Sequence, residues 1–467
     1  MKLSRLLPLI VATALFVENM DSTVIATSLP AMAADLGTSP IALKLAMTTY
    51  LIALAVFIPI SSWVADRVGA RRTFIGAIAV FLFASVGCAM SSSLEALVAA
   101  RALQGAGGAL MVPVGRLVIL RSVPKHELVA AMSWLTVPAL VAPVIGPPLG
   151  GFITTVFDWR WIFFINLPIG VVGIVLALRF IPDLRGPLTR LDGRGFVLSG
   201  VGLALALFGF STMGRHVVSS SLSSSCLIAG LGLLALYVVH ARRLVARGDA
   251  PLLDLRLLRI DTYRASVVAG LIFRVAIGAT PFLLPLMLQV GFGLDALHSG
   301  MLTFASAVGA IFMKTIVTRV LRRFGFRRVL VVNAIVAPLF MMGFGLFSPH
   351  TPALAIIAFL VVAGCFRALQ LTSLNAILYA DVPPESLGQA TSLAGMVQQL
   401  SLSIGVAIGG YALEVAGYIH GVDATDVRNY PVAFVVVAVI AMQSIWALRR
   451  LPDTAGAEVS GLLAPAR

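Results

Sequence analysis

The sequence predicts an all-α integral membrane protein, with fourteen transmembrane helices in two related bundles of six and an inserted central pair. Three observations lead to this prediction: a composition too apolar for a water-soluble domain, apolar runs of membrane-spanning length along the chain, and short strings that recur at a nearly constant separation. The first two indicate a lipid environment, and the third divides the chain into halves.

The composition excludes a water-soluble protein of this length. Of the 467 residues, 59% are hydrophobic and 12% are charged, and the mean hydropathy is +1.00. Soluble domains carry about 25% charged residues, and their single cores stop growing at about 250 to 300 residues. The net charge of +14 forms no basic domain, because Lys and Arg fall between the apolar runs. We therefore expect a lipid bilayer as partner and no nucleic acid.

Fourteen apolar runs are long enough to be membrane helices, since a helix needs about 20 apolar residues to cross the hydrocarbon. They span residues 6–29, 42–65, 73–90, 94–120, 128–154, 161–180, 195–213, 222–240, 265–290, 300–320, 329–347, 352–379, 387–413 and 431–448.

The basic residues predict the orientation of these helices. With both ends of the chain in the cytoplasm, the outer loops hold only Lys44, Arg160, Arg215 and Arg428 of the 34 basic residues. Cytoplasmic loops of membrane proteins carry the excess of Lys and Arg. Cytoplasmic termini also require an even number of crossings, which favours fourteen over thirteen.

Three strings recur in the same order, at separations of 256, 266 and 259 residues: DRVGARR (66–72) and RRFGFRR (322–328), RALQ (101–104 and 367–370), GPPLGG (146–151) and GVAIGG (405–410). Recurrence in order at one spacing indicates two related halves. Each partner lies eight predicted spans after its first copy, so the halves have parallel orientation. Parallel six-helix halves with substrate near the midplane describe the major facilitator architecture.

We predict an N-terminal six-helix bundle (1–181), a linker with two inserted transmembrane helices (182–261), a C-terminal six-helix bundle (262–450) and a cytoplasmic tail (451–467). The inserted helices, within 195–240, repeat no string and carry few polar residues. We therefore expect them at the periphery.

Almost the full length of the chain resembles the fourteen-helix drug:proton antiporter family of the major facilitator superfamily. The resemblance lies in five stretches: the first-helix pattern LDxTVxxxxLP (20–30), the loop pattern GxLADRxGRR (62–72), RxxQGxGxA (101–109), the antiporter pattern GxxxGPxxGG (142–151) and WRWIFFINLPIG (159–170). Ala142 replaces the first glycine of the antiporter pattern, and Ser62 the first glycine of the loop pattern.

The resemblance implies a proton-coupled secondary active transporter that exports small amphipathic molecules or drugs by alternating access. The proton would be the coupling ion, with no other cofactor. It further implies a multi-pass protein of the bacterial cell (inner) membrane that acts as a monomer on a small-molecule substrate.

Three ionisable residues inside the spans are candidates for proton coupling, because charge within a membrane is costly and usually functional. Glu18 and Asp21 are three residues apart and share one face of the first helix, roughly 13 to 18 Å below its outer end. Arg101 starts about 10 Å below the outer end of the fourth helix, within reach of the acids. The resemblance supports Asp21 and a relay role for Arg101. The alternative is a purely structural set of polar contacts.

Two motifs are candidates for gating and bending. Asp66, Arg67, Arg71 and Arg72 lie in a short cytoplasmic turn, where a carboxylate at a helix end holds charged partners and locks an inner gate. Topogenic charge alone is the alternative for the arginines.

The antiporter motif contributes Gly146, Pro147, Gly150 and Gly151. These residues reduce side-chain bulk and allow close helix contact and rocking, or form only a passive kink.

Five polar residues are candidates for the substrate cavity: Gln104, Arg274, Gln289, Arg367 and Gln398. Arg274 and Arg367 place positive charge in the second half opposite the acids of the first, which favours zwitterionic or weakly acidic amphiphiles over multivalent cations. Lys314 and Arg116 lie nearer cytoplasmic ends, and we expect both to snorkel to the interface.

Three other functions stay open: metabolite uptake or exchange on the same fold, a membrane enzyme, and a non-transporting sensor. The sequence has no GxSxG elbow, and HELVA (126–130) lacks the second histidine of HExxH. It has no Walker loop, so ATP is not the expected energy source. Three scattered cysteines lack metal-ligand spacing. We expect neither enzymatic activity nor a metal site.

Overall fold

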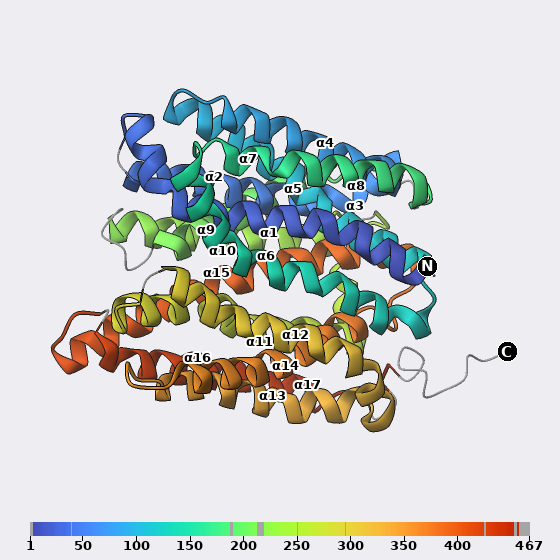
Figure 1. Cartoon of the computed structure of the whole chain (residues 1–467). Helices are drawn as coiled ribbons and strands as arrows, with labels where there is room; N and C mark the ends of the chain where they lie inside the picture. The colour runs from blue at the N-terminus through green and yellow to red at the C-terminus, as the bar shows by residue number, and fades with distance from the viewer. Residues whose placement is uncertain are drawn as a thin grey trace.

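The structure, a computed structural model, describes residues 3–38, 40–186, 190–212, 219–249, 251–294, 296–424, 426–452 and 455–456. These residues form helices and connecting turns, with no β-strand among them. Long helices run side by side in two bundles, with α1 to α8 in one and α11 to α17 in the other (Figure 1). The all-α fold class is confirmed.

The helices have the following bounds: α1 Leu3–Asp35, α2 Pro40–Phe57, α3 Ser61–Val68, α4 Ala70–Ala89, α5 Leu94–Ser122, α6 Leu128–Val156, α7 Trp161–Phe164, α8 Asn166–Phe180, α9 Gly193–Thr212, α10 Ser220–Ala246, α11 Asp261–Leu286, α12 Ala296–Phe324, α13 Phe326–Gly343, α14 Ala353–Ile377, α15 Leu387–His420, α16 Tyr430–Met442 and α17 Ser444–Leu448. Short 3-10 or π turns are η1 Ile58–Ile60, η2 Lys125–Glu127, η3 Leu255–Arg259, η4 Met287–Gly291, η5 Phe344–Leu346, η6 Pro384–Ser386 and η7 Val427–Asn429.

Every predicted run coincides with one helix or with consecutive helical segments, such as α2, η1 and α3 for residues 42–65. Within the described residues, twelve helical stretches are long and apolar enough to cross a membrane. α6 and α15, with 29 and 34 residues, correspond to the other two predicted runs. The count of fourteen crossings and the cytoplasmic position of both ends stay predictions.

The two bundles repeat the same pattern of helix pairs. In the first, α1 packs on α6, and α5 packs on both α2 and α4. In the second, α11 packs on α15, and α14 packs on both α12 and α13. The recurring strings therefore reflect a repeat in space as well as in sequence.

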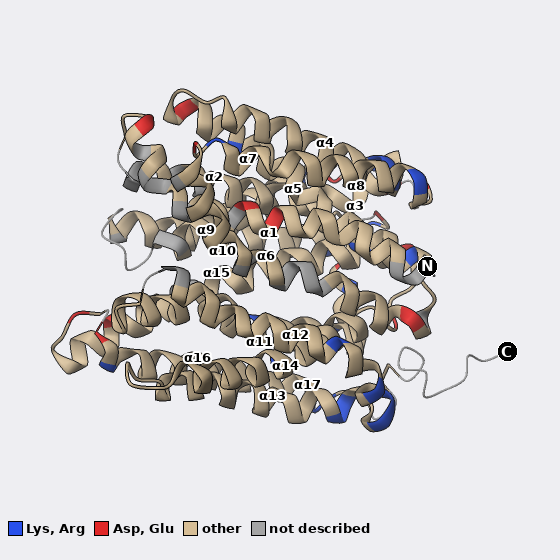
Figure 2. Ribbon diagram, viewed as in Figure 1, with Lys and Arg blue, Asp and Glu red and all other residues tan. Residues whose placement is uncertain are grey.

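Two glycines show why the loop string recurs. Gly69 separates α3 from α4, and Gly325 separates α12 from α13, each with a positive φ of 104° and 75°. Side chains with a Cβ rarely adopt this conformation, so glycine permits the sharp reversal between two long helices. Arginines flank both turns, at the same end of the molecule as the N-terminus (Figure 2).

The inserted helices lie outside both bundles, but they differ in their contacts. α10 packs on α9 and has few other helical neighbours, as expected for a peripheral helix. α9 packs on α2 of the first bundle and α15 of the second, where Leu203 and Leu207 form a small core with Ala55. The prediction of a peripheral position is right for α10, whereas α9 covers the seam between the bundles.

The bundles meet along two further contacts. η1, α3 and α5 pack on α15, and α6 packs on α12. Hydrogen bonds between described residues join the bundles here, among them Ser61 Oγ to Ser392 Oγ at 3.0 Å and Arg116 Nη2 to Gln398 Oε1 at 3.0 Å. Both lie towards the end of the molecule that carries Asp66. The predicted boundaries at residues 181, 261 and 450 stay predictions.

Candidate functional site

A buried ion pair lies within the first bundle. Arg101 Nη1 on α5 donates to Asp21 Oδ2 on α1 at 2.5 Å, and both side chains are almost completely buried. Acidic residues also stand out in the middle of α1, far from the charged helix ends (Figure 2). The depth of the two residues in their helices predicted this contact.

Gln104 and Asn166 complete the hydrogen bonding of Asp21. Gln104 Nε2 donates to Asp21 Oδ1 at 2.9 Å and to Ser85 Oγ at 2.9 Å, while its Oε1 accepts from Arg101 at 2.6 Å. Asn166 Nδ2 on α8 also donates to Asp21 Oδ1, at 3.2 Å. Four helices, α1, α4, α5 and α8, therefore position a single carboxylate.

An aromatic ring covers the cation of this pair. The guanidinium of Arg101 lies over the ring of Tyr50 from α2, 4.2 Å from its centroid. A cation over an aromatic face is stabilised by the ring quadrupole, and more strongly where water is excluded. Arg101 is 1% exposed and Tyr50 1% exposed, so water is excluded here.

Local sequence sets the position of Arg101. α5 begins after Ser93, whose hydroxyl accepts from Ala96 N at 3.2 Å, and Glu95 lies in the first turn. A serine cap and an early acid stabilise a helix start. Arg101 and Gln104 then lie one turn apart, on one face of α5.

Glu18 lies one turn from Asp21 on α1 and is only partly buried. Its Oε2 atom is buried and has no hydrogen-bond partner, and the charges of Arg116 and Asp21 act on it. Arg116 in turn donates to Gln398 of the second bundle. Glu18 is thus placed between the Asp21 pair and the contact between the bundles.

The prediction that Lys314 and Arg116 snorkel to the interface is wrong. The Nζ atom of Lys314 is buried and has no hydrogen-bond partner among the described residues. The Arg116 side chain is buried, with 8% exposure, and its guanidinium reaches Gln398 on α15. Position along the helix suggested a cytoplasmic end, but the seam with the second bundle offers a polar partner that an isolated helix lacks.

The antiporter motif packs directly against the helix that carries Asp21. At Gly146 on α6, an added Cβ atom would overlap Thr23 on α1, with 2.9 Å to the Thr23 Cβ. The carbonyl of Gly150 accepts from Thr154 Oγ1 at 2.7 Å. At Gly151 an added Cβ would meet open space. The side chain of Pro147 lies outside the described residues. Close approach of α1 and α6 therefore depends on Gly146.

We expect Gly146→Ala to lower both stability and transport. The added methyl group must push Thr23 aside, and overpacking a tight contact costs about 1 to 3 kcal/mol. Thermal unfolding of the purified protein and the initial rate of dye export measure the two effects. Gly151→Ala is the matched control and should leave both unchanged. Thr23→Ala should restore part of the loss in Gly146→Ala, because it removes the hydroxyl and keeps the Cβ atom. Equal loss in both glycine variants would contradict this account.

The loop with Asp66 forms part of the contact between the bundles. Arg121 Nη2 donates to Asp66 Oδ1 at 2.8 Å. Asp66 also lies beside Gly388, where an added Cβ would be 3.2 Å from Asp66 Oδ2. Gly388 is in the first turn of α15, and a carboxylate near the N-terminus of a helix is stabilised by the helix dipole.

The three predicted arginines of this loop make weaker contacts. The guanidinium of Arg67 lies 5.5 Å from the ring centroid of Trp63, and Arg72 Nε lies 3.7 Å from Asp183 Oδ2. Arg71 is half-buried. Of the four predicted gating residues, Asp66 has the contacts suited to holding α15.

We expect Asp66→Asn to loosen the end of the seam where Ser61 and Ser392 meet. The variant loses the charge that faces α15, an effect of about 0.3 to 1 kcal/mol, and the ion pair with Arg121. The alkylation rate of a cysteine introduced by Ser392→Cys should rise about twofold to fivefold, as that free energy implies. Arg72→Gln, an exposed charge change in the same loop, serves as control. An unchanged alkylation rate in Asp66→Asn would rule out a locking role.

The predicted cavity residues do not line a single cavity. Gln104 belongs to the Asp21 network, and Gln398 accepts from Arg116. Arg274 Nη2 donates to Asn375 Oδ1 at 2.7 Å within the second bundle. Gln289 is exposed in η4, 3.5 Å from Ser299 Oγ. Arg367 lines a separate cavity among α11, α12, α13 and α14.

Several residues of the site were not singled out from the sequence: Tyr50, Ser85, Arg121 and Asn166. Asn166 lies in the WRWIFFINLPIG stretch, so its presence in a motif was the available signal. The others become partners only when separate helices are packed together.

Two bundles of membrane helices repeat the same packing, and one of them buries an ion pair between a carboxylate and a guanidinium. These features define the class of multi-pass secondary transporters. The sequence profile of the Major Facilitator Superfamily matches residues 11–406 and, in a second match, 266–462. The chain belongs to the Major Facilitator Superfamily, as the motifs predicted, and it is a multi-pass membrane protein.

Relatives in bacteria extend over nearly the full chain. A protein of Klebsiella pneumoniae strain 342, provisionally named multidrug resistance protein MdtD, is 38% identical over 457 residues, which cover 96% of this chain and 94% of the relative. The MdtD protein of Serratia proteamaculans is 36% identical over 451 residues, covering 95% and 92%.

Solved structures share the fold at low sequence identity. The human organic anion transporter MFSD10 (TETRAN) matches with a TM-score of 0.68 and 13% identity, covering 96% of this chain and all of that one. The proton:xylose symporter XylE matches with a TM-score of 0.67 and 14% identity, covering 98% of each chain.

Proposed function

We propose that this protein is a proton-coupled secondary transporter that exports small amphipathic molecules by alternating access. The observation that carries the proposal is the Asp21 carboxylate, buried in α1 and held by Arg101, Gln104 and Asn166. Its helix packs through Thr23 on the antiporter motif of α6. The multidrug resistance names of the full-length relatives support export as the direction and drug-like compounds as the substrates.

In the proposed cycle, ionised Asp21 pairs with Arg101 and holds α1 against α5. A proton that reaches Asp21 removes its charge, so the ion pair is lost and the guanidinium is free to seek another partner. Glu18, one turn away and facing Arg116, offers a second carboxylate on the path towards the seam between the bundles. Because α1 packs closely on α6 at Gly146, a shift of α1 moves α6 and changes the contact between α6 and α12.

We also propose the coupling ion, the cofactor requirement and the oligomeric state, which membership of the family alone does not give. The proton is the only coupling agent, and no metal or organic cofactor takes part. Transport involves no covalent chemistry and no nucleic acid, and a single chain in the bacterial inner membrane performs it.

Purified protein in proteoliposomes tests the function. A panel of amphipathic dyes with negative, zero and positive charge is supplied together with an imposed pH gradient, and a pH indicator is trapped inside. We expect at least one dye to move against its own gradient while protons move the opposite way, and a protonophore should abolish this accumulation. Dye movement that only follows its own gradient, with no proton movement, would refute coupling.

A further inference from the structure

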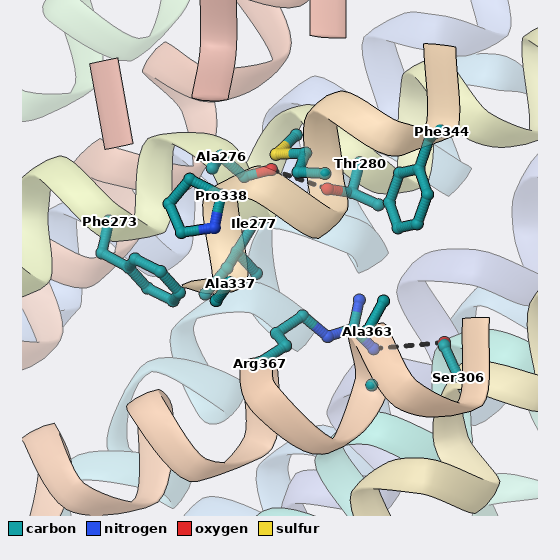
Figure 3. Close-up of a pocket in the computed structure, with 12 residues that line it drawn as sticks. Phe273, Ala276, Ile277, Thr280, Ser306, Ala337, Pro338, Phe344, Ala363 and Arg367 are labelled. Carbon is teal, nitrogen blue, oxygen red and sulfur yellow. Dashed lines mark hydrogen bonds between the residues drawn. The ribbon is translucent and has the colours of Figure 1, made fainter. Parts of the chain in front are cut away.

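We propose that the cavity beside Arg367 is a binding site for the carboxylate of an amphipathic organic anion. The site would be formed by Arg367 on α14, Thr280 on α11 and Ser306 on α12 (Figure 3). The idea that this anion is a transported substrate rests on the proposed function. The anion site itself rests on the geometry below.

Internal symmetry relates this cavity to the Asp21 site. Arg367 is the repeat partner of Arg101 in the RALQ string, and α11 takes the place of α1 in the second bundle. Thr280 lies 259 residues after Asp21, the same separation as between the GPPLGG and GVAIGG strings. The second bundle thus keeps the arginine and has a threonine where the first bundle has its carboxylate.

The Arg367 guanidinium lacks a counter-ion among the described residues. Its Nη2 donates to Ser306 Oγ at 3.3 Å, and its Nε is buried without a hydrogen-bond partner. The ion pairs of the described residues do not include Arg367, whereas Arg101 has Asp21. An unpaired cation deep in a membrane protein is costly, and such residues pair with another charge or face a cavity.

The cavity has room for a carboxylate and an apolar lining. The free space in it is about 40 Å³, and the cavity is partly open. One water needs about 10 to 15 Å³ of such space, so a group of about three heavy atoms fits beside Arg367. Apolar side chains of Phe273, Ile277, Met341 and Phe344 form much of its wall. Figure 3 shows Arg367 directed towards Ser306 on one wall, with Thr280 and Phe344 on the other. A carboxylate at Arg367 would occupy this space, and its apolar body would extend past the phenylalanines towards the open side.

Within the described part of the chain, Thr280 is the reason that Arg367 has no internal ion pair like the one between Arg101 and Asp21. Its hydroxyl donates to the carbonyl of Ala276 at 2.8 Å, so it is a short, neutral side chain turned to its own helix. Arg367 lies 14 residues from the first residue of α14 and 10 from the last, roughly 15 Å along the helix axis from the nearer end. Phospholipid headgroups stay at the membrane surface, so the carboxylate comes from a single molecule that can enter the protein, either a soluble organic acid or a fatty acid.

Binding of 2-naphthoate to the purified protein in nanodiscs, without any pH gradient, tests the site. Its neutral and cationic counterparts are 2-naphthylmethanol and 2-naphthylmethylammonium. We expect naphthoate to bind about tenfold to a hundredfold more tightly than the alcohol, as a charge-assisted hydrogen bond implies, and the ammonium ion to bind least.

Two substitutions should remove this preference. Arg367→Gln takes away the cation, and naphthoate should then bind no better than the alcohol. Thr280→Asp recreates the arrangement of the first bundle, so the internal carboxylate should displace naphthoate and raise the thermal unfolding temperature. Arg274→Gln, at an arginine that already donates to Asn375 outside this cavity, is the control and should keep the preference.

The outcomes separate the site from the transport cycle. Equal binding of naphthoate and the alcohol to the unmodified protein, or an unchanged preference in Arg367→Gln and Thr280→Asp, would overturn the anion site even if proton-coupled export is found. Naphthoate binding lost in both variants would support the site even in a protein that exchanges no protons. Displacement of naphthoate by oleate in the nanodisc would support the carboxylate site and assign it to a fatty acid.

Discussion

Asp21→Asn is expected to abolish uphill transport driven by a pH gradient, reducing dye accumulation in proteoliposomes to the level of protein-free vesicles. Asp21 is the buried carboxylate that contacts Arg101, Gln104 and Asn166. An amide keeps the shape and can still accept hydrogen bonds, but it cannot take up or release a proton. The substitution therefore removes proton exchange and preserves most of the packing.

Two comparisons make this result specific. Glu18→Gln tests whether the second carboxylate is also required, and we expect a smaller loss because its Oε2 has no hydrogen-bond partner to lose. Asp192→Asn changes a carboxylate that bonds His240 in the linker region, outside the site, and should transport normally. Accumulation at the unmodified rate in Asp21→Asn would exclude Asp21 as the coupling residue.

The sequence predicted the fold because its signals are local and strong. Each run of about 20 apolar residues predicts a helix independently of the other runs. The repeated strings around Gly69 and Gly325 correspond to the same sharp turn in each bundle. The depth argument for Asp21 and Arg101 also succeeded, since rise per residue is the same in every α-helix.

The remaining site residues depend on how helices pack, which no single run encodes. Arg116 lies near the end of α5, where a long basic side chain usually reaches the membrane surface. Instead, α15 of the other bundle brings Gln398 to it. Nothing in the sequence around Tyr50 predicts that its ring covers a cation. The ring meets Arg101 only when α5 packs on α2. Likewise, the inserted pair was predicted as one peripheral unit, whereas α9 alone reaches both bundles. Tertiary contacts, rather than composition, decide these positions.

Arg101→Gln is expected to be among the most destabilising single changes in the chain. It leaves Asp21 buried without its cation, and removal of one partner of a buried ion pair costs about 3 to 5 kcal/mol. Neutralising both partners, in Asp21→Asn with Arg101→Gln, should recover most of that loss, because a neutral hydrogen-bonded pair leaves no unpaired charge. Reversible unfolding in mixed micelles gives the four free energies of the double-mutant cycle.

An exposed ion pair of the same chain provides the control for this cycle. Asp426 accepts from Arg428 at 3.0 Å in the loop before α16, and hydrogen bonds from Arg428 lower the pKa of Asp426 to about 2. Both groups are in contact with water, which screens their attraction, so Arg428→Gln should leave the unfolding free energy unchanged within error. If Arg101→Gln were equally mild, the Asp21 carboxylate would not need its cation in the folded protein. The ion pair could then not be the element whose loss on protonation moves α1.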